Sequence, residues 1–542
     1  MPTLTGGQAL VQQLKREGID TVFGLPGVQL DWAFDALWEE REHFRVYYTR
    51  HEQACGYMAD GYARATGKIG ICLVVPGPGL LNAAAALATA YACSSPVFCV
   101  TGQIHSEQIG KGRGLLHEIN DQLETIASVT KWQALARTPA DIPGIVHEAV
   151  RQLSTGRPRP VEIEVPPDIL EAKSEVTLVD PAAHERPAGD PDLVEKAAQV
   201  LGGARRPLIF AGGGVIASGA WDELQRVAEA LEAPVIMTNN AKGVLSDRHH
   251  LALPGRAMRE LAPDADVVLL AGTRFLQGIM QRDIPRWLRP EQTFIQIDID
   301  DEELGRNVTP QISIQADARR ALDGLAGALE RHNGVRESRR EELLALKQYL
   351  ADDAARNHPQ SDFALAIRAE LPDDGIFVQE STQVGYWSAQ AFPVYQPRTY
   401  FTSGYQGTLG YGFATALGVQ AGRPDKKVIS INGDGGFFYN VQELSTMVQQ
   451  KIPLTTIVFN DNAYGNVKRY QETRFDGHVI ASTLYNPDML KLAEAYGLEG
   501  RRAATPEELQ VTLREVLKRD EPVLIEVPVG PMPQQRFTPR GG

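Results

Sequence analysis

The sequence has few cysteines and no pattern that gives them a chemical role. Four occur in 542 residues, Cys55, Cys72, Cys93 and Cys99, in mostly apolar surroundings and without C-x-x-C spacing. This excludes a disulfide scaffold and favours reduced, buried thiols over a zinc site. The N-terminus also lacks a basic segment followed by an apolar block, as a secretory signal would have. We therefore expect a cytoplasmic protein.

Long apolar runs and basic patches are missing as well. The most apolar stretch, residues 71–93, contains Pro76, Pro78 and Asn82, which would break and polarise a membrane-spanning helix. Lys and Arg number 54 against 68 Asp and Glu, a net charge of −14. A negative field repels phosphate backbones and anionic lipids. The sequence therefore predicts neither nucleic acid nor membrane as a partner.

Short runs of Val, Ile and Leu alternate with longer amphipathic segments. Continuous apolar runs suit strands buried on both faces of a parallel sheet. Several of them end in glycine-containing turns, as strands do in doubly wound folds. The runs are 69–75, 96–100, 207–210, 267–271, 294–299, 428–431 and 456–459. We predict an α/β protein built from doubly wound parallel sheets.

Two shifts in composition divide the chain. Residues 171–192 are polar and contain three prolines, so they are typical of a linker. A second break lies at about 331–360, around a charged helical stretch. The divisions predict three domains, at residues 1–170, 190–330 and 360–542.

One segment of the first domain is repeated in the third. Pro160–Pro166 and Pro522–Pro528 match at six of seven positions, and each follows a candidate amphipathic helix. Chance convergence on a good strand sequence would give the same match. The alternative is that the outer domains share a fold and enclose a different α/β domain.

The strongest chemical signal lies in the third domain. The segment Ile431–Asn440 reads Ile-Asn-Gly-Asp-Gly-Gly-Phe-Phe-Tyr-Asn, and Phe459–Gly465 reads Phe-Asn-Asp-Asn-Ala-Tyr-Gly. Each follows a predicted strand, and one helix separates them. Asp434 and Asp461 can therefore lie side by side at the carboxyl edge of the sheet. An Asp-Gly turn or an Asx turn would explain either half alone, but not both at one crossover spacing.

Paired carboxylates beside glycines suggest a metal and a phosphate. Hard oxygen ligands suit Mg²⁺, which completes its octahedron with phosphate oxygens. Three glycines, Gly433, Gly435 and Gly436, let backbone N–H groups approach a phosphate at a helix start. The pattern predicts a magnesium–diphosphate site.

These motifs resemble the thiamine-diphosphate motif of the decarboxylase and acetohydroxyacid synthase superfamily. The resemblance covers nearly the whole chain, because five motifs occur in the family's order. They are Phe23–Gly27, Arg50–Gln53 with Ala59–Arg64, Gly77–Asn82, Gly404–Gly410, and Gly433–Gly435 with Asn460–Asn462. It implies a pyrimidine-binding N-terminal domain, a central domain and a diphosphate-binding C-terminal domain. It also implies a homodimer or a dimer of dimers, with each cofactor at a subunit interface.

The resemblance assigns roles to individual residues. Asp434, Asp461 and the backbone carbonyl of Ala463 would hold the Mg²⁺ that bridges the diphosphate. Leu409 would wedge under the bent cofactor, and the carbonyl of Gly407 would bind its aminopyrimidine. The remaining implied cofactor-binding residues are Pro26, Glu52, Asn82, Gly385, Tyr386, Gly433, Gly435, Gly436, Tyr464 and Gly465.

The chain departs from the family at two of these places. Most members carry Asn where this sequence has Asp461. The extra negative charge would either tighten metal binding or weaken diphosphate binding through repulsion. The Tyr386-Trp387 pair stands where acetohydroxyacid synthases have Gln-His, which puts direct contacts there in doubt.

Glu52 is the implied proton-transfer residue. It opens a predicted helix, where an acidic side chain is also favoured by the helix dipole. Within the resemblance its carboxylate protonates the pyrimidine ring nitrogen, so that the ring's amino group can take a proton from the thiazolium carbon. A carboxylate with this task must be close and partly desolvated.

The substrate loop departs from both main branches of the family. Only His105 stands where pyruvate decarboxylases have two adjacent histidines. The synthases have Phe-Gln-Glu where this sequence has Leu116-His117-Glu118. His117 would then be a catalytic, substrate-facing residue, or else a solvated loop histidine.

The central domain carries a glycine-rich turn, Ala211–Gly219, without Gly-x-Gly-x-x-Gly spacing, which is a weak nucleotide signal. Flavin-containing relatives have Arg-Phe-Asp-Asp-Arg after a later strand, where Arg274–Gly278 lacks both acids. We expect FAD to be absent or non-essential.

The sequence leaves three functions open. The first is a thiamine-diphosphate- and Mg²⁺-dependent decarboxylase or carboligase acting on a 2-oxo acid, similar to acetolactate synthase. The second is a 2-hydroxyacyl-CoA lyase or an oxalyl-CoA decarboxylase, with Arg536 and Arg540 binding an acyl-CoA phosphate. The third is a non-catalytic regulatory subunit, which would need neither Glu52 nor the metal carboxylates.

Overall fold

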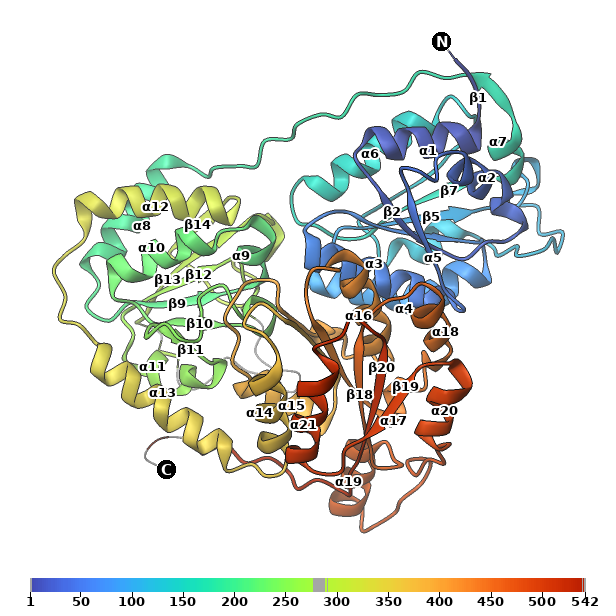
Figure 1. Ribbon diagram of the computed structural model, residues 1–542. Coiled ribbons are helices and arrows are strands. Elements are labelled where there is room, and N and C mark those ends of the chain that lie inside the picture. Colours follow the sequence, from blue (N-terminus) through green and yellow to red (C-terminus); the bar gives the residue numbers. More distant parts are fainter. Residues whose placement is uncertain (1, 276–287, 290, 539, 541–542) are drawn as a thin grey trace.

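The computed structural model describes residues 2–275, 288–289, 291–538 and 540. Within them lie three six-stranded parallel sheets with helices packed around them, and one two-stranded ribbon (Figure 1). The prediction of an α/β protein with three doubly wound parallel sheets is confirmed. We call the parts built on these sheets the N-terminal, central and C-terminal units. No helix in the described ranges is long and apolar enough to cross a membrane.

The N-terminal unit has the strand order β3-β2-β4-β5-β7-β6. Its first helix is fixed by a capping box, in which Thr5 and Gln8 bind each other's backbone N–H groups. The strands are β2 (Thr21–Gly24), β3 (Arg45–Tyr48), β4 (Gly70–Val74), β5 (Val97–Gly102), β6 (Trp132–Leu135) and β7 (Val161–Val165); the helices are α1 (Gly6–Arg16), α2 (Asp31–Glu39), α3 (Glu52–Thr66), α4 (Pro78–Cys93), α5 (Gln122–Ala127), α6 (Ile142–Ser154) and α7 (Pro167–Glu171).

The C-terminal unit has the order β16-β15-β17-β18-β20-β19. The strands are β15 (Ile376–Gln379), β16 (Tyr400–Phe401), β17 (Val428–Gly433), β18 (Thr455–Asn460), β19 (Glu499–Arg502) and β20 (Val523–Pro528); the helices are α14 (Gln360–Glu370), α15 (Gln383–Ala391), α16 (Tyr411–Gly422), α17 (Asp434–Phe437), α18 (Leu444–Gln449), α19 (Gly465–Arg474), α20 (Met489–Tyr496) and α21 (Pro506–Val516).

The two outer units share one topology. In each sheet the strands run second, first, third, fourth, sixth and fifth along the chain. The repeated Pro-Val-x-Ile-Glu-Val-Pro segments form β7 and β20, which take the same place in their sheets. Glu164 accepts a hydrogen bond from Gln103 at the end of β5, and Glu526 accepts one from Asn460 at the end of β18. The repeat therefore reflects a shared fold, not chance.

The central unit differs from its neighbours, with the order β11-β10-β9-β12-β13-β14. This is the arrangement of dinucleotide-binding folds, in which the order reverses between the first and fourth strands. The strands are β9 (Leu208–Ala211), β10 (Val235–Met237), β11 (Ala252–Leu253), β12 (Val267–Ala271), β13 (Thr293–Asp298) and β14 (Ile312–Gln315); the helices are α8 (Pro191–Gly203), α9 (Gly213–Ser218), α10 (Trp221–Leu231), α11 (Met258–Leu261), α12 (Ala318–His332) and α13 (Arg340–Ala355).

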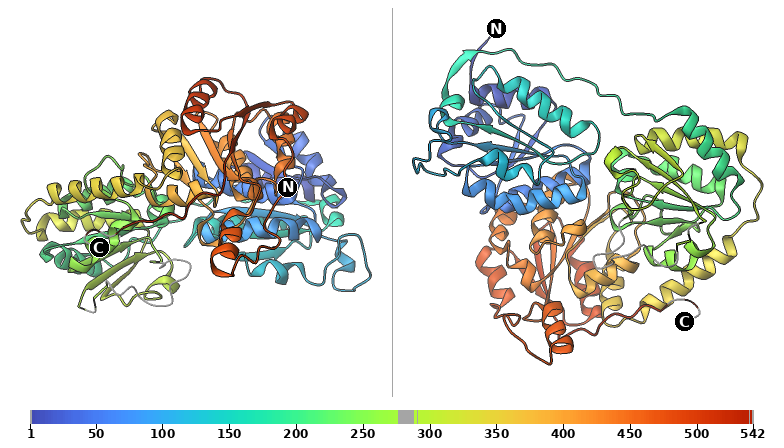
Figure 2. Two further views of the ribbon diagram at one scale, coloured as in Figure 1. Left: turned by 90° about the horizontal axis from the view of Figure 1, so that it is seen from below. Right: turned by 180° about the vertical axis from the view of Figure 1, so that it is seen from behind.

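An extended segment crosses from the N-terminal to the central unit. It follows the ribbon of β1 (Thr3–Thr5) and β8 (Lys173–Glu175), and residues 176–190 have no helix or strand (Figures 1 and 2). This agrees with the polar, proline-containing composition predicted for a linker. The domain limits themselves remain predictions.

Helices α3 and α16 join the two outer units into a common core. They approach so closely that only glycine fits at two positions. A Cβ atom on Gly61 would lie 2.2 Å from the carbonyl oxygen of Thr415, and one on Gly418 would lie 2.0 Å from that of Met58. Glu52 is the first residue of α3, so this contact helps to fix its place.

Candidate active site

The candidate residues of the N-terminal unit gather at one edge of its sheet. They follow four neighbouring strands, β3, β2, β4 and β5, at their carboxyl ends. This is the edge at which ligands bind in open α/β sheets. The residues are Glu52 after β3, Pro26 after β2, Asn82 after β4 and His117 after β5.

Glu52 and Asn82 form the centre of this group. Nδ2 of Asn82 donates a 2.9 Å hydrogen bond to Oε2 of Glu52. Gly79 lies against the other oxygen, since a Cβ atom there would be 3.6 Å from Oε1. Glu52 is half-buried, as a proton-transferring carboxylate needs to be.

His117 is held beside the glycine-rich loop. Its backbone has a φ of +69°, and a Cβ atom on Gly77 would lie 2.2 Å from its carbonyl oxygen. Its Nδ1 lies 3.1 Å from Oε1 of Gln29, whose Nε2 donates to the carbonyl of Leu116. These contacts show a fixed loop, and the role of His117 toward a substrate remains a prediction.

The C-terminal unit repeats this arrangement on its own sheet. Its candidate residues follow β15, β16, β17 and β18, the strands that correspond to those of the N-terminal unit. They are Gly385 and Tyr386 after β15, Gly407 and Leu409 after β16, Gly433, Asp434, Gly435 and Gly436 at the end of β17, and Asp461, Ala463, Tyr464 and Gly465 after β18. The two sheets thus present equivalent edges with different chemistry.

Asp434 and Asp461 lie against each other, as the crossover spacing predicts. Burial, and next the negative charge of Asp434, raise the pKa of Asp461 to about 6; burial also raises the pKa of Asp434. Nδ2 of Asn486 donates a 2.6 Å hydrogen bond to Oδ2 of Asp434. A buried carboxylate, Asp434, and a half-buried one, Asp461, that repel each other are a donor set for a divalent cation. The described residues contain no group of three or more His, Cys, Asp and Glu side chains placed as metal ligands.

The glycines near Asp434 and Asp461 differ in how closely other atoms pack against them. A Cβ atom on Gly436 would lie 2.4 Å from the Glu380 carboxylate, and one on Gly435 would lie 2.7 Å from the Tyr464 ring. A Cβ atom on Gly433 would meet only a methyl group of Thr382, at 3.5 Å. Packing therefore requires glycine at 435 and 436, but not at 433.

Glu380 connects three segments of the candidate site. It directly follows β15, packs on Gly436, and accepts a 2.6 Å hydrogen bond from the N–H of Gly410. Burial raises its pKa to about 8. Thr382 caps the start of α15, because its Oγ1 accepts a 2.8 Å hydrogen bond from the N–H of Gly385.

The loop with Gly407 and Leu409 lies beside the N-terminal unit. Gly407 is exposed with a φ of +61°, and Leu409 is half-buried. The hydroxyls of Thr408 and Thr89 of α4 are 2.9 Å apart. The loop therefore has a fixed contact with the other sheet.

Within the described part of one chain, the Glu52–Asn82 pair has no direct polar contact with the Asp434–Asp461 pair. Among the described residues, no hydrogen bond or ion pair links Glu52 or Asn82 to Asp434 or Asp461. Helix α19, which follows Asp461, lies at the end of the C-terminal unit that points away from the N-terminal unit (Figures 1 and 2).

Comparison with known proteins decides the family. Three parts of the chain match models of the thiamine pyrophosphate enzymes. Residues 4–125 match the N-terminal TPP binding domain, residues 194–325 the central domain, and residues 380–527 the C-terminal TPP binding domain. This chain belongs to the thiamine pyrophosphate enzyme family. The predicted resemblance is thereby confirmed, and with it the prediction of a thiamine-diphosphate-dependent enzyme.

Full-length relatives carry more than one activity in their names. A probable acetolactate synthase large subunit of Methanocaldococcus jannaschii is 34% identical, over 99% of this chain and 94% of the relative. A probable 2-ketoarginine decarboxylase of Pseudomonas aeruginosa is 34% identical, over 97% and 94%. The acetolactate synthase isozyme 1 large subunit of Escherichia coli K12 is 32% identical, over 96% and 93%.

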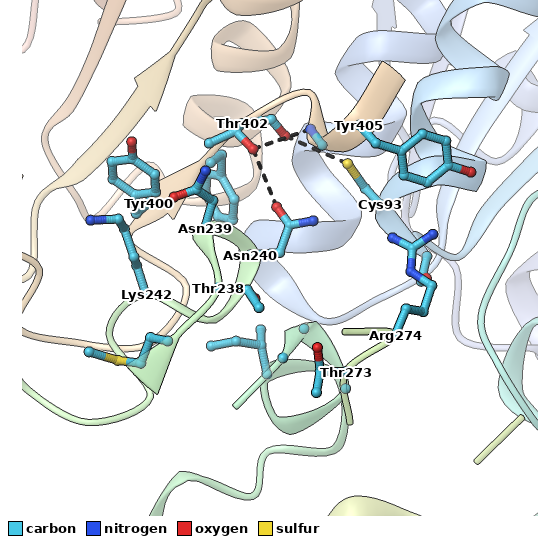
Figure 3. A pocket seen from close by; sticks show the side chains of 18 of the residues that line it. Cys93, Thr238, Asn239, Asn240, Lys242, Thr273, Arg274, Tyr400, Thr402 and Tyr405 are labelled. Atoms are coloured by element: carbon cyan, nitrogen blue, oxygen red, sulfur yellow. Dashed lines mark hydrogen bonds between the residues drawn. The ribbon is translucent and has the colours of Figure 1, made fainter. Parts of the chain in front are cut away.

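A cavity of 1510 Å³ lies where the three units meet (Figure 3). Oγ1 of Thr402 donates to Oδ1 of Asn240 at 3.4 Å, and the guanidinium of Arg274 lies 4.8 Å from the centre of the Tyr405 ring. The cavity reaches the carboxyl ends of β9 and β12, the reversal point of the central sheet.

The glycine-rich turn at this cavity is explained by close packing. A Cβ atom on Gly212 would lie 2.2 Å from the carbonyl oxygen of Gly272, and one on Gly214 would lie 2.7 Å from its Cα. The prediction about FAD depends on residues 274–278, of which residues 276–278 lie outside the described residues. The absence of FAD therefore remains a prediction.

Three residues in or beside the site have no motif of their own. Asn486 bridges Asp434 and Asn460, with a second bond of 2.9 Å to Asn460, and it lies in a loop without a recognisable pattern. Gln29 orders His117, and Glu380 connects the cofactor segments. Glu380 alone gives a sequence signal, an acid directly after an apolar strand.

Proposed function

We propose that this enzyme uses thiamine diphosphate and Mg²⁺ to act on a 2-oxo acid, by decarboxylation with or without carboligation. The observation that carries the proposal is the pair of equivalent sheet edges. One presents a proton-transfer carboxylate, Glu52, and the other a metal pair, Asp434 and Asp461. When bound, the cofactor supplies the electron sink for breaking or making a carbon–carbon bond at a carbonyl.

The residues present fit this cofactor and its metal. Asp434, Asp461 and the carbonyl of Ala463 would hold Mg²⁺, because a cation relieves the repulsion between the two carboxylates. The backbone at Gly433 leaves room for the diphosphate. Ala463 is placed for this by its own N–H, which donates a 3.1 Å hydrogen bond to Oδ1 of Asp461.

Glu52 would hold the proton at the pyrimidine ring nitrogen. Asn82 occupies Oε2, so Oε1, on the side of Gly79, is the oxygen left for the ring. The loops around Gly77 and His117 border this position and would limit its access to water. A positioned carboxylate of this kind contributes by general acid–base catalysis.

The two edges would meet across a homodimer. Both carry exposed apolar side chains, which a monomer rarely leaves in patches. Val28 and Leu116 of the N-terminal unit are both 63% exposed, while Ile480 and Tyr485 of the C-terminal unit are 75% and 96% exposed. A second copy would cover both patches and bring Glu52 of one chain to the metal pair of the other. A dimer of dimers would keep the same sites.

The substrate is proposed as a small 2-oxo acid on the strength of the relatives. Their names include acetolactate synthase and 2-ketoarginine decarboxylase. His117, in the substrate loop, would help to select among 2-oxo acids. For the acyl-CoA alternative, the N–H groups of Arg536 and Arg540 bind Asn357 and Glu260 and leave both side chains exposed. Among the residues that the structure describes, no contact favours it over a 2-oxo acid.

A substrate panel tests the proposal. Purified protein with thiamine diphosphate and Mg²⁺ is given pyruvate, 2-ketoarginine, benzoylformate or oxalyl-CoA, and carbon dioxide and acyloin products are measured. We expect turnover of at least one free 2-oxo acid, and turnover slower by roughly 10² to 10⁴ in the Glu52→Gln variant under the same conditions. Turnover of oxalyl-CoA alone would replace the proposal with the acyl-CoA alternative.

A further inference from the structure

A buried carboxylate of the C-terminal unit binds the backbone that leads into α3. Glu443 ends the short 3₁₀ helix Val441–Glu443 and has no exposed surface. The N–H of Arg50 donates to both of its oxygens, each at 3.0 Å. His51 follows and caps α3, and Glu52 is the first residue of that helix. The carboxylate is therefore attached to the turn that presents Glu52.

The same turn has few other contacts with the C-terminal unit. Oγ1 of Thr446 donates to Oε2 of Glu443 at 2.6 Å and to the carbonyl of Tyr48 at 3.4 Å. Gln449 donates to the hydroxyl of Tyr48 at 2.7 Å and accepts from Nη2 of the Arg50 side chain at 3.4 Å. Glu443 is thus the inner contact, directly on the peptide backbone, and Gln449 is an outer contact between exposed side chains.

The chemistry of Glu443 suits a fixed anchor. Burial raises its pKa, whereas the donors Thr446, Arg50 and His51 favour its charged form. A buried charge that loses a hydrogen-bond partner carries a large desolvation cost. The contact between Glu443 and the N–H of Arg50 therefore resists breaking. Its position is also informative, since Glu443 belongs to the segment that follows Asp434 and α17.

We propose that Glu443 is a positioning residue for Glu52. Through the backbone of Arg50 and His51 it fixes the start of α3. It thereby fixes the position of the Glu52 carboxylate. The segment that follows one metal ligand thereby sets the place of the proton-transfer group in the same chain. This inference rests on the proposed function of Glu52.

The test compares Glu443→Gln with Gln449→Ala. Gln keeps the volume of Glu but offers one acceptor oxygen, whereas Gln449→Ala removes the outer contact only. In the apoprotein, we expect Glu443→Gln to speed amide hydrogen exchange in peptides covering residues 48–54, and Gln449→Ala to leave it unchanged. Thr446→Val, which removes one donor to Glu443, should give a smaller increase.

A second readout follows the proton itself. Deuterium exchange at the thiazolium carbon of added thiamine diphosphate, measured after acid quench, reports proton transfer without substrate. We expect Glu443→Gln to slow it about tenfold to a hundredfold, since a shift of about 1 Å in a positioned group costs up to about 10² in rate. The Kd for thiamine diphosphate should stay within a few-fold of the wild-type value.

The outcomes separate the positioning role of Glu443 from the proton-transfer role of Glu52. Wild-type exchange at the thiazolium carbon in Glu443→Gln would overturn the positioning role. Faster amide exchange throughout the C-terminal unit would also overturn it, because the residue would then act on the fold as a whole. Unchanged exchange at the thiazolium carbon in Glu52→Gln would overturn the proposed proton-transfer role of Glu52. That result would hold even if Glu443→Gln speeds amide exchange in residues 48–54.

Discussion

Nδ2 of Asn82 donates to Oε2 of Glu52 across 2.9 Å, and thereby joins the first turn of α4 to the first residue of α3. Both helices begin at the carboxyl edge of the N-terminal sheet. The bond orients the carboxylate and leaves Oε1 as its free oxygen. In the proposed function, a single amide would thereby select which atom of Glu52 faces a bound pyrimidine.

Glu52→Gln should bind thiamine diphosphate almost as well as the wild-type protein but turn over roughly 10² to 10⁴ times more slowly, the range of a positioned proton-transfer group. Gln retains the volume and the bond to Asn82 but cannot carry the charge. The measurement is carbon dioxide release at saturating substrate. The exposed residue Glu171, changed to Gln, serves as control, and an unchanged rate in Glu52→Gln would remove this residue from the mechanism.

Activity should require both Mg²⁺ and thiamine diphosphate, because cation and diphosphate neutralise each other beside Asp434 and Asp461. Dialysis against a chelator, followed by separate and joint addition of the two components, tests this. Only joint addition should restore the rate. Full activity with either component missing would contradict the assignment of the metal pair.

Asp461→Asn should stabilise the apoprotein and weaken Mg²⁺ binding. The change removes the charge that opposes the buried Asp434, and with it a repulsion on the order of 1 kcal/mol. Thermal unfolding without metal, and its shift on addition of Mg²⁺, measure the two effects. The exposed residue Asp476, changed to Asn, is the matched control. A lower unfolding temperature of Asp461→Asn without metal would contradict the expectation.

Mixing two inactive variants should restore activity if the site forms between subunits. Glu52→Gln and Asp434→Ala, mixed after reversible dissociation, give half mixed dimers with one intact site of two, about a quarter of wild-type activity. Asp434→Ala mixed with Asp461→Ala should give none, because both changes lie in one unit. No recovery in the first mixture, with subunit exchange confirmed by mass, would mean that each chain completes its own site.

Glu164→Gln should make stability less dependent on pH. Burial raises the pKa of Glu164 to about 7, so the folded state keeps its proton while the unfolded chain loses it above about 4.5. Wild-type stability therefore falls as pH rises from about 4.5 to about 7, by at most about 1.4 kcal/mol per pH unit for this group. Denaturant unfolding at several pH values should show this slope reduced in Glu164→Gln. The same slope in both proteins would exclude Glu164 as its source.

The sequence by itself determined the architecture and most of the candidate site. Apolar runs followed by glycine predicted the parallel sheets, because strands buried on both faces need no alternation of polar residues. The repeated strand predicted the shared fold of the outer units. The spacing of Asp434 and Asp461 predicted their contact, since one βαβ crossover brings consecutive parallel strands to the same edge.

Only the tertiary structure decided the contacts between distant segments. Asn486 reaches Asp434 from a loop without a motif, and Glu443 reaches Arg50 across 393 positions of the chain. Tight packing against Glu380 and Tyr464 requires glycine at 436 and 435, where the sequence had suggested open backbone for a phosphate. Such contacts depend on how folded surfaces meet, and neither periodicity nor spacing along the chain carries that information.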